Sequence, residues 1–300
     1  SFNVIGAVVI GAAMYVIFRL QPNFALSRIN STQISIFHTV FNLTNTIILF
    51  PFSKGLVKLS GLFIDDSKVE IGTDEVQITI RHLDERILET PSFAVQNAIK
   101  EVVHMGEITL NNTKEAVDAL LNNNDEKAKK VFEVEKVIDA HQKIINEYLV
   151  KINNLSLTNK QKRIVNNLFN TVSNIERVGD HAENLAELAQ EKVANDLYLS
   201  DEAYDELKNI CSIALESFEY AIRSITTEDK EDIRRVEETE KKVDNLKDEL
   251  RQKHIDRLSQ GICSSENGVV FIDALINLER ISDHSLNIAN FVASEIPHKN

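Results

Sequence analysis

Four acidic pairs in this sequence share one spacing, a Glu followed four positions later by an Asp. They are Glu135/Asp139, Glu176/Asp180, Glu240/Asp244 and Glu279/Asp283. On an α-helix, residues four positions apart lie on one face, so both carboxylates of a pair can point at a common centre. Carboxylates gathered there repel one another unless a cation joins them. Because the ligand atoms are oxygens, the pattern favours hard cations such as Mg²⁺, Mn²⁺, Ca²⁺ or oxidised iron.

Two of the pairs lie inside a longer repeated motif. Residues 174–187 read NIERVGDHAENLAE, and residues 277–290 read NLERISDHSLNIAN. A single Glu-x-x-x-Asp is common in an acidic chain, so the repetition is what favours a metal site. His181 and His284 stand about 140° around the helix from the Glu of each copy, which favours core or hydrogen-bonding roles over direct ligation.

Four further residues of the motif are candidates to support the carboxylates from outside the ligand set. They are Asn184, Asn287, Arg177 and Arg280. The two arginines also offer an alternative, because they could neutralise the acidic residues without any metal.

The elements that must position these residues are helices. Apolar periodicity and capping signals predict six long helices, at about 92–121, 126–153, 159–193, 201–225, 229–258 and 266–295. They group as three plus three, and the acidic pairs fall on the second and third helix of each group. We therefore predict an all-α domain at 91–300, a duplicated three-helix bundle with repeats at about 91–195 and 196–300.

The first 64 residues have a different composition. They contain no Asp or Glu, and residues 2–18 and 34–52 are uncharged runs. Each run is close to the lower limit of the roughly 17 to 25 residues that cross a bilayer, so we predict two transmembrane helices. A buried helical hairpin is the alternative. Residues 65–90 read as a charged connector. Because the chain begins at Ser1 inside an apolar run, we expect a fragment or a processed chain.

The second apolar run carries an unusual number of polar residues. Such groups are costly in hydrocarbon unless they face protein, water or a solute, so they are candidates to line a transport path. The set is His38, Thr39, Asn42 and Asn45, together with Asn3, whose Phe-Asn-Val context resembles that of Asn42. Hydrogen bonding between helices is the alternative.

Net charge narrows the function classes. The chain carries 46 acidic and 33 basic residues, a net charge of −13, which argues against nucleic-acid binding. Two cysteines are too few for a disulfide framework. No nucleophile motif or phosphate-binding loop is present, and the acidic pairs lack the Glu-x-x-His spacing of di-iron enzymes, so we expect no enzyme.

The two helix triplets, with their Glu-x-x-x-Asp pairs and the ER[V/I][G/S]DH signature, resemble a PhoU domain. The stretches FNVIG, HTVFNLTNTIILFPF and LDERILETPSFA resemble the C-terminal part of the bacterial Na/Pi cotransporter family, whose members often end in a PhoU-like domain. The Gln-Ser-Ser repeats that mark substrate binding in that family are absent from this sequence.

This resemblance implies the C-terminal portion of a sodium-dependent phosphate symporter, with residues 1–64 as its last membrane segment. It also implies a multinuclear iron or zinc cluster at the acidic pairs, and Na⁺ as the coupling ion. We expect a multi-pass protein of the inner (plasma) membrane with a cytoplasmic C-terminal domain. The expected partners are phosphate, Na⁺, membrane lipid and either a second copy or a phosphate-signalling protein. The alternative is a membrane-tethered helical adaptor that does not transport.

Overall fold

The computed structural model describes residues 19–20, 82–83 and 85–295. A short 3-10 helix, η2 (Glu85–Glu89), precedes six long α-helices. These are α6 (Pro91–Asn122), α7 (Asp125–Asn153), α8 (Asn159–Ala194), α9 (Asp201–Thr227), α10 (Lys230–Ser259) and α11 (Ser265–Glu295). The prediction of six long helices is confirmed.

The predicted membrane segment cannot be compared with the structure. Both of its transmembrane helices lie outside the described residues, as do the transport-path candidates Asn3, His38, Thr39, Asn42 and Asn45. Among the residues that are described, no helix combines the length and hydropathy needed to cross a bilayer.

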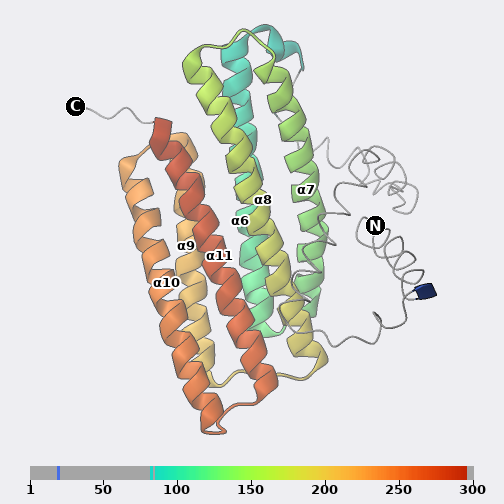
Figure 1. Cartoon of the computed structure of the whole chain (residues 1–300), viewed down its shortest axis with the longest axis vertical. Helices are drawn as coiled ribbons and strands as arrows, with labels where there is room; N and C mark the ends of the chain where they lie inside the picture. Colours follow the sequence, from blue (N-terminus) through green and yellow to red (C-terminus); the bar gives the residue numbers. More distant parts are fainter. Residues whose placement is uncertain (1–18, 21–81, 84, 296–300) are drawn as a thin grey trace. The chain divides into compact units, whose positions relative to one another are not determined.

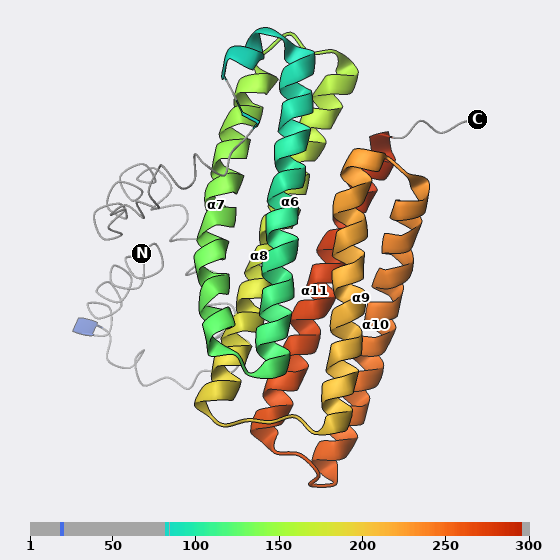
Figure 2. The same cartoon turned by 180° about the vertical axis from the view of Figure 1, so that it is seen from behind.

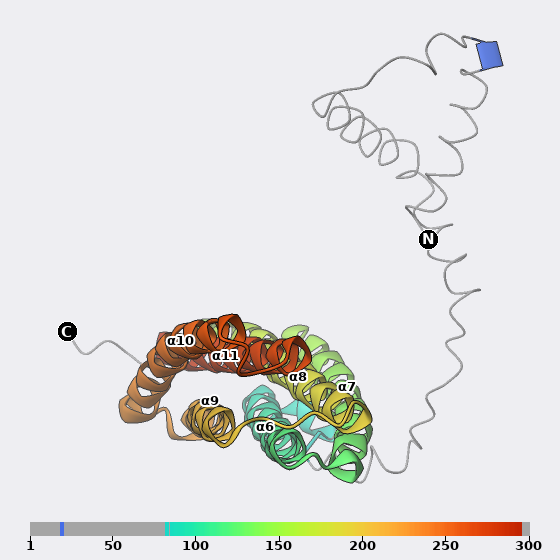
Figure 3. The same ribbon diagram turned by 90° about the horizontal axis from the view of Figure 1, so that it is seen from below.

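The six helices form two three-helix bundles. Helices α6, α7 and α8 pack on one another, and α9, α10 and α11 form the second bundle. The main contacts between the bundles are α8 against α11 and α6 against α9. Seen from below in Figure 3, α8 and α11 lie in one layer, α6 and α9 lie in the other, and α7 and α10 stand at opposite ends. The third helix of each repeat therefore lies both at an acidic pair and at the junction between repeats.

Polar caps set where the helices begin. Thr158 and Gln161 form a reciprocal capping box at the start of α8, and the Asn124 side chain accepts from the backbone N–H of Lys127 at the start of α7. Ser200 accepts in the same way from Ala203. Each cap satisfies a backbone N–H that has no partner inside the helix. The capping residues lie at the positions where the sequence predicted breaks between helices.

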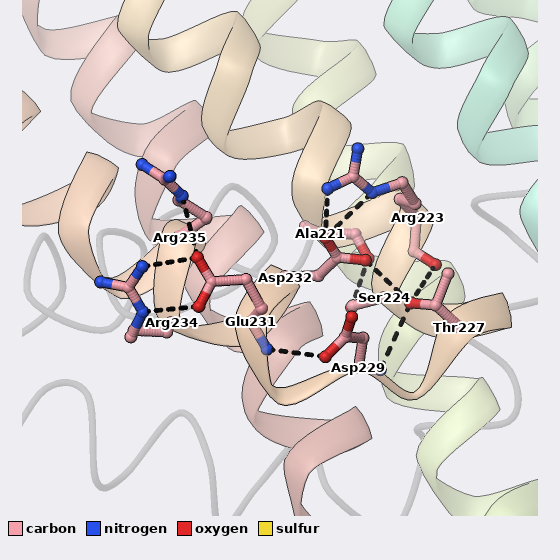
Figure 4. Close-up of polar contacts among 9 residues, drawn as sticks. All are labelled: Ala221, Arg223, Ser224, Thr227, Asp229, Glu231, Asp232, Arg234 and Arg235. Atoms are coloured by element: carbon pink, nitrogen blue, oxygen red, sulfur yellow. Dashed lines mark hydrogen bonds and ion pairs between the residues drawn. The ribbon is translucent and has the colours of Figure 1, made fainter.

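The turn between α9 and α10 is held by a network of charged side chains (Figure 4). The Arg223 Nε donates to Asp232 Oδ1 at 2.9 Å, and the Thr227 hydroxyl donates to Asp232 Oδ2 at 2.8 Å. Asp229 caps α10 by accepting from the backbone N–H of Glu231. The network fixes the hairpin and so the register of α10, which carries the third acidic pair.

Helix α6 approaches α9 closely at Gly106. A Cβ added there would overlap Ile222 Cδ1 and lie 3.0 Å from Ile222 Cγ1. Gly179 on α8 is less crowded, since its added Cβ would lie 3.4 Å from Ile138 Cγ2, an ordinary packing distance. The two glycines therefore differ in why the chain carries no side chain there.

The same substitution should consequently have opposite effects at these glycines. Gly179→Ala should raise the free energy of unfolding by about 0.5–1 kcal/mol, because Ala favours helix over Gly. Gly106→Ala should lower the free energy of unfolding by about 1 kcal/mol or more, because overpacking displaces Ile222. Denaturant unfolding measures both. Adding Ile222→Ala should remove the difference, and equal effects at the two glycines would contradict the close α6–α9 contact.

Candidate metal centres

The first two acidic pairs meet between α7 and α8. Burial, together with the nearby carboxylates of Asp139 and Glu183, raises the pKa of Glu135 to about 7. On α8, burial is again the largest cause of the raised pKa values of Glu176 and Asp180, and Asp139 on α7 adds to both. The structure thus brings the four residues that the sequence paired close enough to interact electrostatically. Arg177 lowers the pKa values of Glu176 and Asp180 but does not outweigh burial and repulsion.

The last two pairs meet between α10 and α11. Glu240, Asp244 and Asp283 each offer a carboxylate oxygen, and these oxygens all lie within 4.8 Å of one another. Burial raises the pKa of Glu240, and the charges of Asp244, Asp283 and Glu279 raise it further. Three carboxylates at this spacing from two helices can share one cation with small side-chain movements.

Basic side chains partly neutralise this second group. Lys247 Nζ lies 3.3 Å from Glu279 Oε1, and Arg280 donates to Asp283 Oδ2 at 3.2 Å. The alternative noted from the sequence, in which Arg280 pairs with the acidic residues, is therefore present here. The pKa of Asp283 is nevertheless raised, mainly by burial and by Glu279. Lys247 and Arg280 reduce the repulsion without removing it.

Glu183 belongs to the first group but was missed in the sequence. It lies on α8, three positions after Asp180, and burial together with Glu187, Asp180 and Asp139 raises its pKa. Residues three positions apart on a helix are neighbours, so the spacing from Asp180 could have identified Glu183 as a member of the group. Its counterpart in the second repeat is Leu286, however, so a search for repeated acidic residues passes over it.

The Asn and His residues of the repeated motif join α8 to α11. Asn277 Oδ1 accepts from Asn184 Nδ2 at 3.1 Å and lies 2.9 Å from His181 Nδ1. In the mirrored contact, Asn174 Oδ1 accepts from Asn287 Nδ2 at 3.3 Å and lies 2.9 Å from His284 Nδ1. Because an amide oxygen can only accept, both Nδ1 atoms carry the proton.

The two imidazoles stack between these amides, with ring centroids 5.6 Å apart. Burial lowers the pKa of His284 to about 4, and His181 and the nearby arginines contribute to the shift, so this ring is neutral at pH 7. The hydrogen-bonding role expected for the histidines is observed. Asn184 and Asn287 bind across the junction between repeats, while their predicted support of a cation stays a prediction.

A family model agrees with this architecture. Residues 102–189 and 207–292, together more than half of the chain, match the model of the PhoU domain, one segment for each helix triplet. Two solved structures share the fold. PhoU of Pseudomonas aeruginosa superposes with a TM-score of 0.64 at 23% identity, covering 67% of this chain and 96% of that one. The phosphate transport system regulatory protein PhoU of Streptococcus pneumoniae gives a TM-score of 0.63 at 18% identity, covering 69% and 96%.

Similarity to curated proteins extends beyond the helical domain. YjbB of Salmonella typhimurium, which is named for inorganic phosphate export, is 22% identical over 98% of this chain and 53% of its own length. The chain thus spans about half the length of that relative. The phosphate-specific transport system accessory protein PhoU homolog 1 of Thermotoga maritima is 26% identical over 59% of this chain and 76% of its own.

The raised pKa of Glu135 predicts how the metal-free protein responds to pH. The folded carboxyl keeps its proton up to about pH 7, whereas the unfolded one releases it near its model value of 4.5. Because the folded state holds this proton more tightly, protonation of Glu135 stabilises the fold. This contribution to the free energy of unfolding is present below pH 4.5 and is lost as the pH rises through 7. With a chelator present, the wild-type protein should lose free energy of unfolding between about pH 5 and 8. In Glu135→Gln this loss should be about 1–2 kcal/mol smaller, after allowance for solvent screening.

Urea unfolding at both pH values measures this difference. The exposed Glu133→Gln on the same helix is the control and should keep the wild-type pH dependence. A divalent cation should flatten the wild-type profile. If Glu135→Gln and wild type lost the same stability, the repulsion between α7 and α8 would be disproved.

Proposed function

Because the chain belongs to the PhoU domain family, we propose that it is the metal-binding regulatory end of a phosphate transport protein. Residues 91–300 act as a cytoplasmic domain that senses cations and controls phosphate movement. Residues 1–64 are the attached segment of a multi-pass protein in the cell membrane, where Asn42 and its polar neighbours line the path. The role is regulatory and not enzymatic.

One observation carries the metal part of this proposal. Two groups of carboxylates occupy equivalent places in the two repeats, each group spans two helices, and burial raises pKa values in both. Half-buried acidic residues that repel one another are a source of instability, and a cation would remove it by drawing the carboxylates together. The oxygen-only ligands fit a hard cation or an oxidised iron cluster, and zinc is the other cluster metal that the family resemblance implies.

Such a domain can convert cation binding into a change of helix packing. The third helix of each repeat carries two of the carboxylates on one side and the Asn–His contact on another. A cation that pulls α8 toward α7, or α11 toward α10, therefore acts on a helix that also packs against the other repeat. A signalling protein or a second copy of the chain could read this packing.

The transported solute is proposed from the relatives and from the sequence resemblance. The curated relatives described above are named for phosphate export or for phosphate-specific transport. The Na/Pi cotransporter resemblance adds sodium coupling and implies uptake, the opposite direction of transport. The adaptor alternative predicts no flux at all.

Metal content should depend on the acidic residues. The Asp180→Asn/Asp283→Asn variant keeps side-chain shape but removes one charged ligand from each group, so the purified chain should bind less metal while circular dichroism shows unchanged helicity. Cation addition should raise the melting temperature of wild type but much less that of the variant.

The control for that experiment is Asp205→Asn/Asp256→Asn, which removes the same charge from two exposed positions. It should match wild type in metal content and in the cation-dependent shift. Elemental analysis and calorimetry that found neither metal nor a shift in wild type would refute the metal centres. The acidic residues would then be paired with Arg280, Lys247 and other basic residues only.

Transport should be measured on the full-length protein in membrane vesicles. We expect radiolabelled phosphate to move faster when a Na⁺ gradient is imposed than with K⁺ in its place, and we expect the Asp180→Asn/Asp283→Asn change to alter the rate. Inverting the gradient gives the direction of flux. A rate of phosphate transport that does not depend on Na⁺ would refute sodium coupling. Absence of phosphate transport would favour the adaptor.

A further inference from the structure

A second type of polar cluster lies between α6 and α7, apart from the acidic groups. Glu101 and His104 stand one turn apart on α6, and His141 lies on α7. Each offers one ligand atom, and these three atoms lie within 4.8 Å of one another. Glu101 and His141 are fully buried, and His104 is half-buried. The set contains two imidazoles and one carboxylate, whereas the acidic groups are carboxylates.

The His141 ring is held in the orientation that a metal ligand needs. Its Nδ1 lies 3.1 Å from the backbone oxygen of Val137, and because a carbonyl can only accept, Nδ1 carries the proton. The other ring nitrogen, Nε2, is then the atom that can offer a lone pair to a metal. Backbone carbonyls fix metal-binding histidines in this way, setting both tautomer and ring direction.

The Nε2 atom is buried and points into the cluster. Among the residues that the structure describes, it has no hydrogen-bond partner, and the nearest charged atom, Glu101 Oε1, is 3.6 Å away. That separation is too long for a hydrogen bond. It is close to the roughly 3.3 Å between two ligand atoms that each bind a tetrahedral Zn²⁺ at about 2.0–2.1 Å.

Glu101 is prepared for the same role. Its Oε2 accepts from the backbone N–H of His82 at 2.9 Å, which orients the carboxylate and leaves Oε1 toward His141. Burial alone would raise the pKa of Glu101, but contact with His141 and the His82 N–H outweigh burial, and the pKa is lowered.

We propose that Glu101, His104 and His141 form a separate binding site for a borderline divalent cation of the Zn²⁺ class. Two imidazoles and a carboxylate supply three ligands, and the half-buried side of His104 leaves a fourth position for water. The spacing Glu-x-x-His along α6 is the one that helical bundles use for metal ligation. Hard cations such as Mg²⁺ should prefer the acidic groups, since they bind imidazole weakly.

Binding there would tie the start of the helical domain to its bundle. Glu101 holds the backbone of His82, which precedes η2, while His141 belongs to α7. A cation that links Glu101 to His141 would thus fix the stretch before α6 against α7. The site could be occupied independently of the acidic groups.

Co²⁺ is the probe, because its visible absorption is intense in a four-coordinate site with nitrogen ligands and weak in an octahedral oxygen site. The full chain is titrated with Co²⁺ in the Asp180→Asn/Asp283→Asn background, which weakens binding at the acidic groups. We expect about one equivalent with the intense spectrum, displaced by Zn²⁺ and not by Mg²⁺. His104→Gln and Glu101→Gln should each weaken Co²⁺ binding at least about tenfold and abolish the intense band.

Glu107→Gln is the matched control, since it removes the same charge from an exposed position on α6. It should leave the spectrum unchanged. His104 is half-buried, so His104→Gln should fold even if a change at the buried His141 does not. Absence of the intense band, or its survival in His104→Gln, would overturn the proposal and leave a buried His–Glu pair. Either result is independent of whether the acidic groups bind metal.

Discussion

The repulsion among carboxylates held between paired helices is the constraint on which the rest of the structure depends. Between α7 and α8, burial and like charge raise the pKa of Glu135 to about 7, and the same causes act on Glu240 between α10 and α11. Removing such groups from water without compensation costs free energy that the hydrophobic core must supply. The helices around them are long and capped, and α6 packs closely on α9 at Gly106. In the proposed function, a cation offsets the charge of the acidic residues that these helices bring together.

The repeated motif does two jobs because a helix has more than one face. Glu176 and Asp180 interact with acidic residues of α7. On another face of α8, Asn174, His181 and Asn184 contact α11, where the second copy of the motif makes the equivalent contacts to α8. The Asn–His contact is specific, since each amide oxygen accepts from an imidazole and from another amide. A low pKa keeps His284 neutral at pH 7. The same fourteen-residue stretch thus carries two carboxylates of an acidic group and the contacts of the repeat junction, which gives a physical route between them.

Much of the helical domain could be predicted from the sequence. Periodicity and caps gave six helices, and the four-residue spacing gave the faces on which the acidic residues meet, because both depend on local geometry. The pairing of Asn277 with His181 could not be predicted, because it depends on which helices of the two repeats touch. Glu183 and the cluster at Glu101 were missed for a related reason. Neither recurs in the second repeat, and His104 and His141 are brought together only by the packing of α6 on α7.

The central claim is that the four Glu-x-x-x-Asp pairs hold cations between helices. Crystals of the full chain grown with Mn²⁺ test it directly, by anomalous diffraction at a wavelength where manganese scatters. We predict peaks between α7 and α8, bound by Glu135, Asp139, Glu176 and Asp180, and equivalent peaks between α10 and α11, with Lys247 and Arg280 displaced from Glu279 and Asp283. Peaks absent from both places, with those ion pairs intact, would contradict the account.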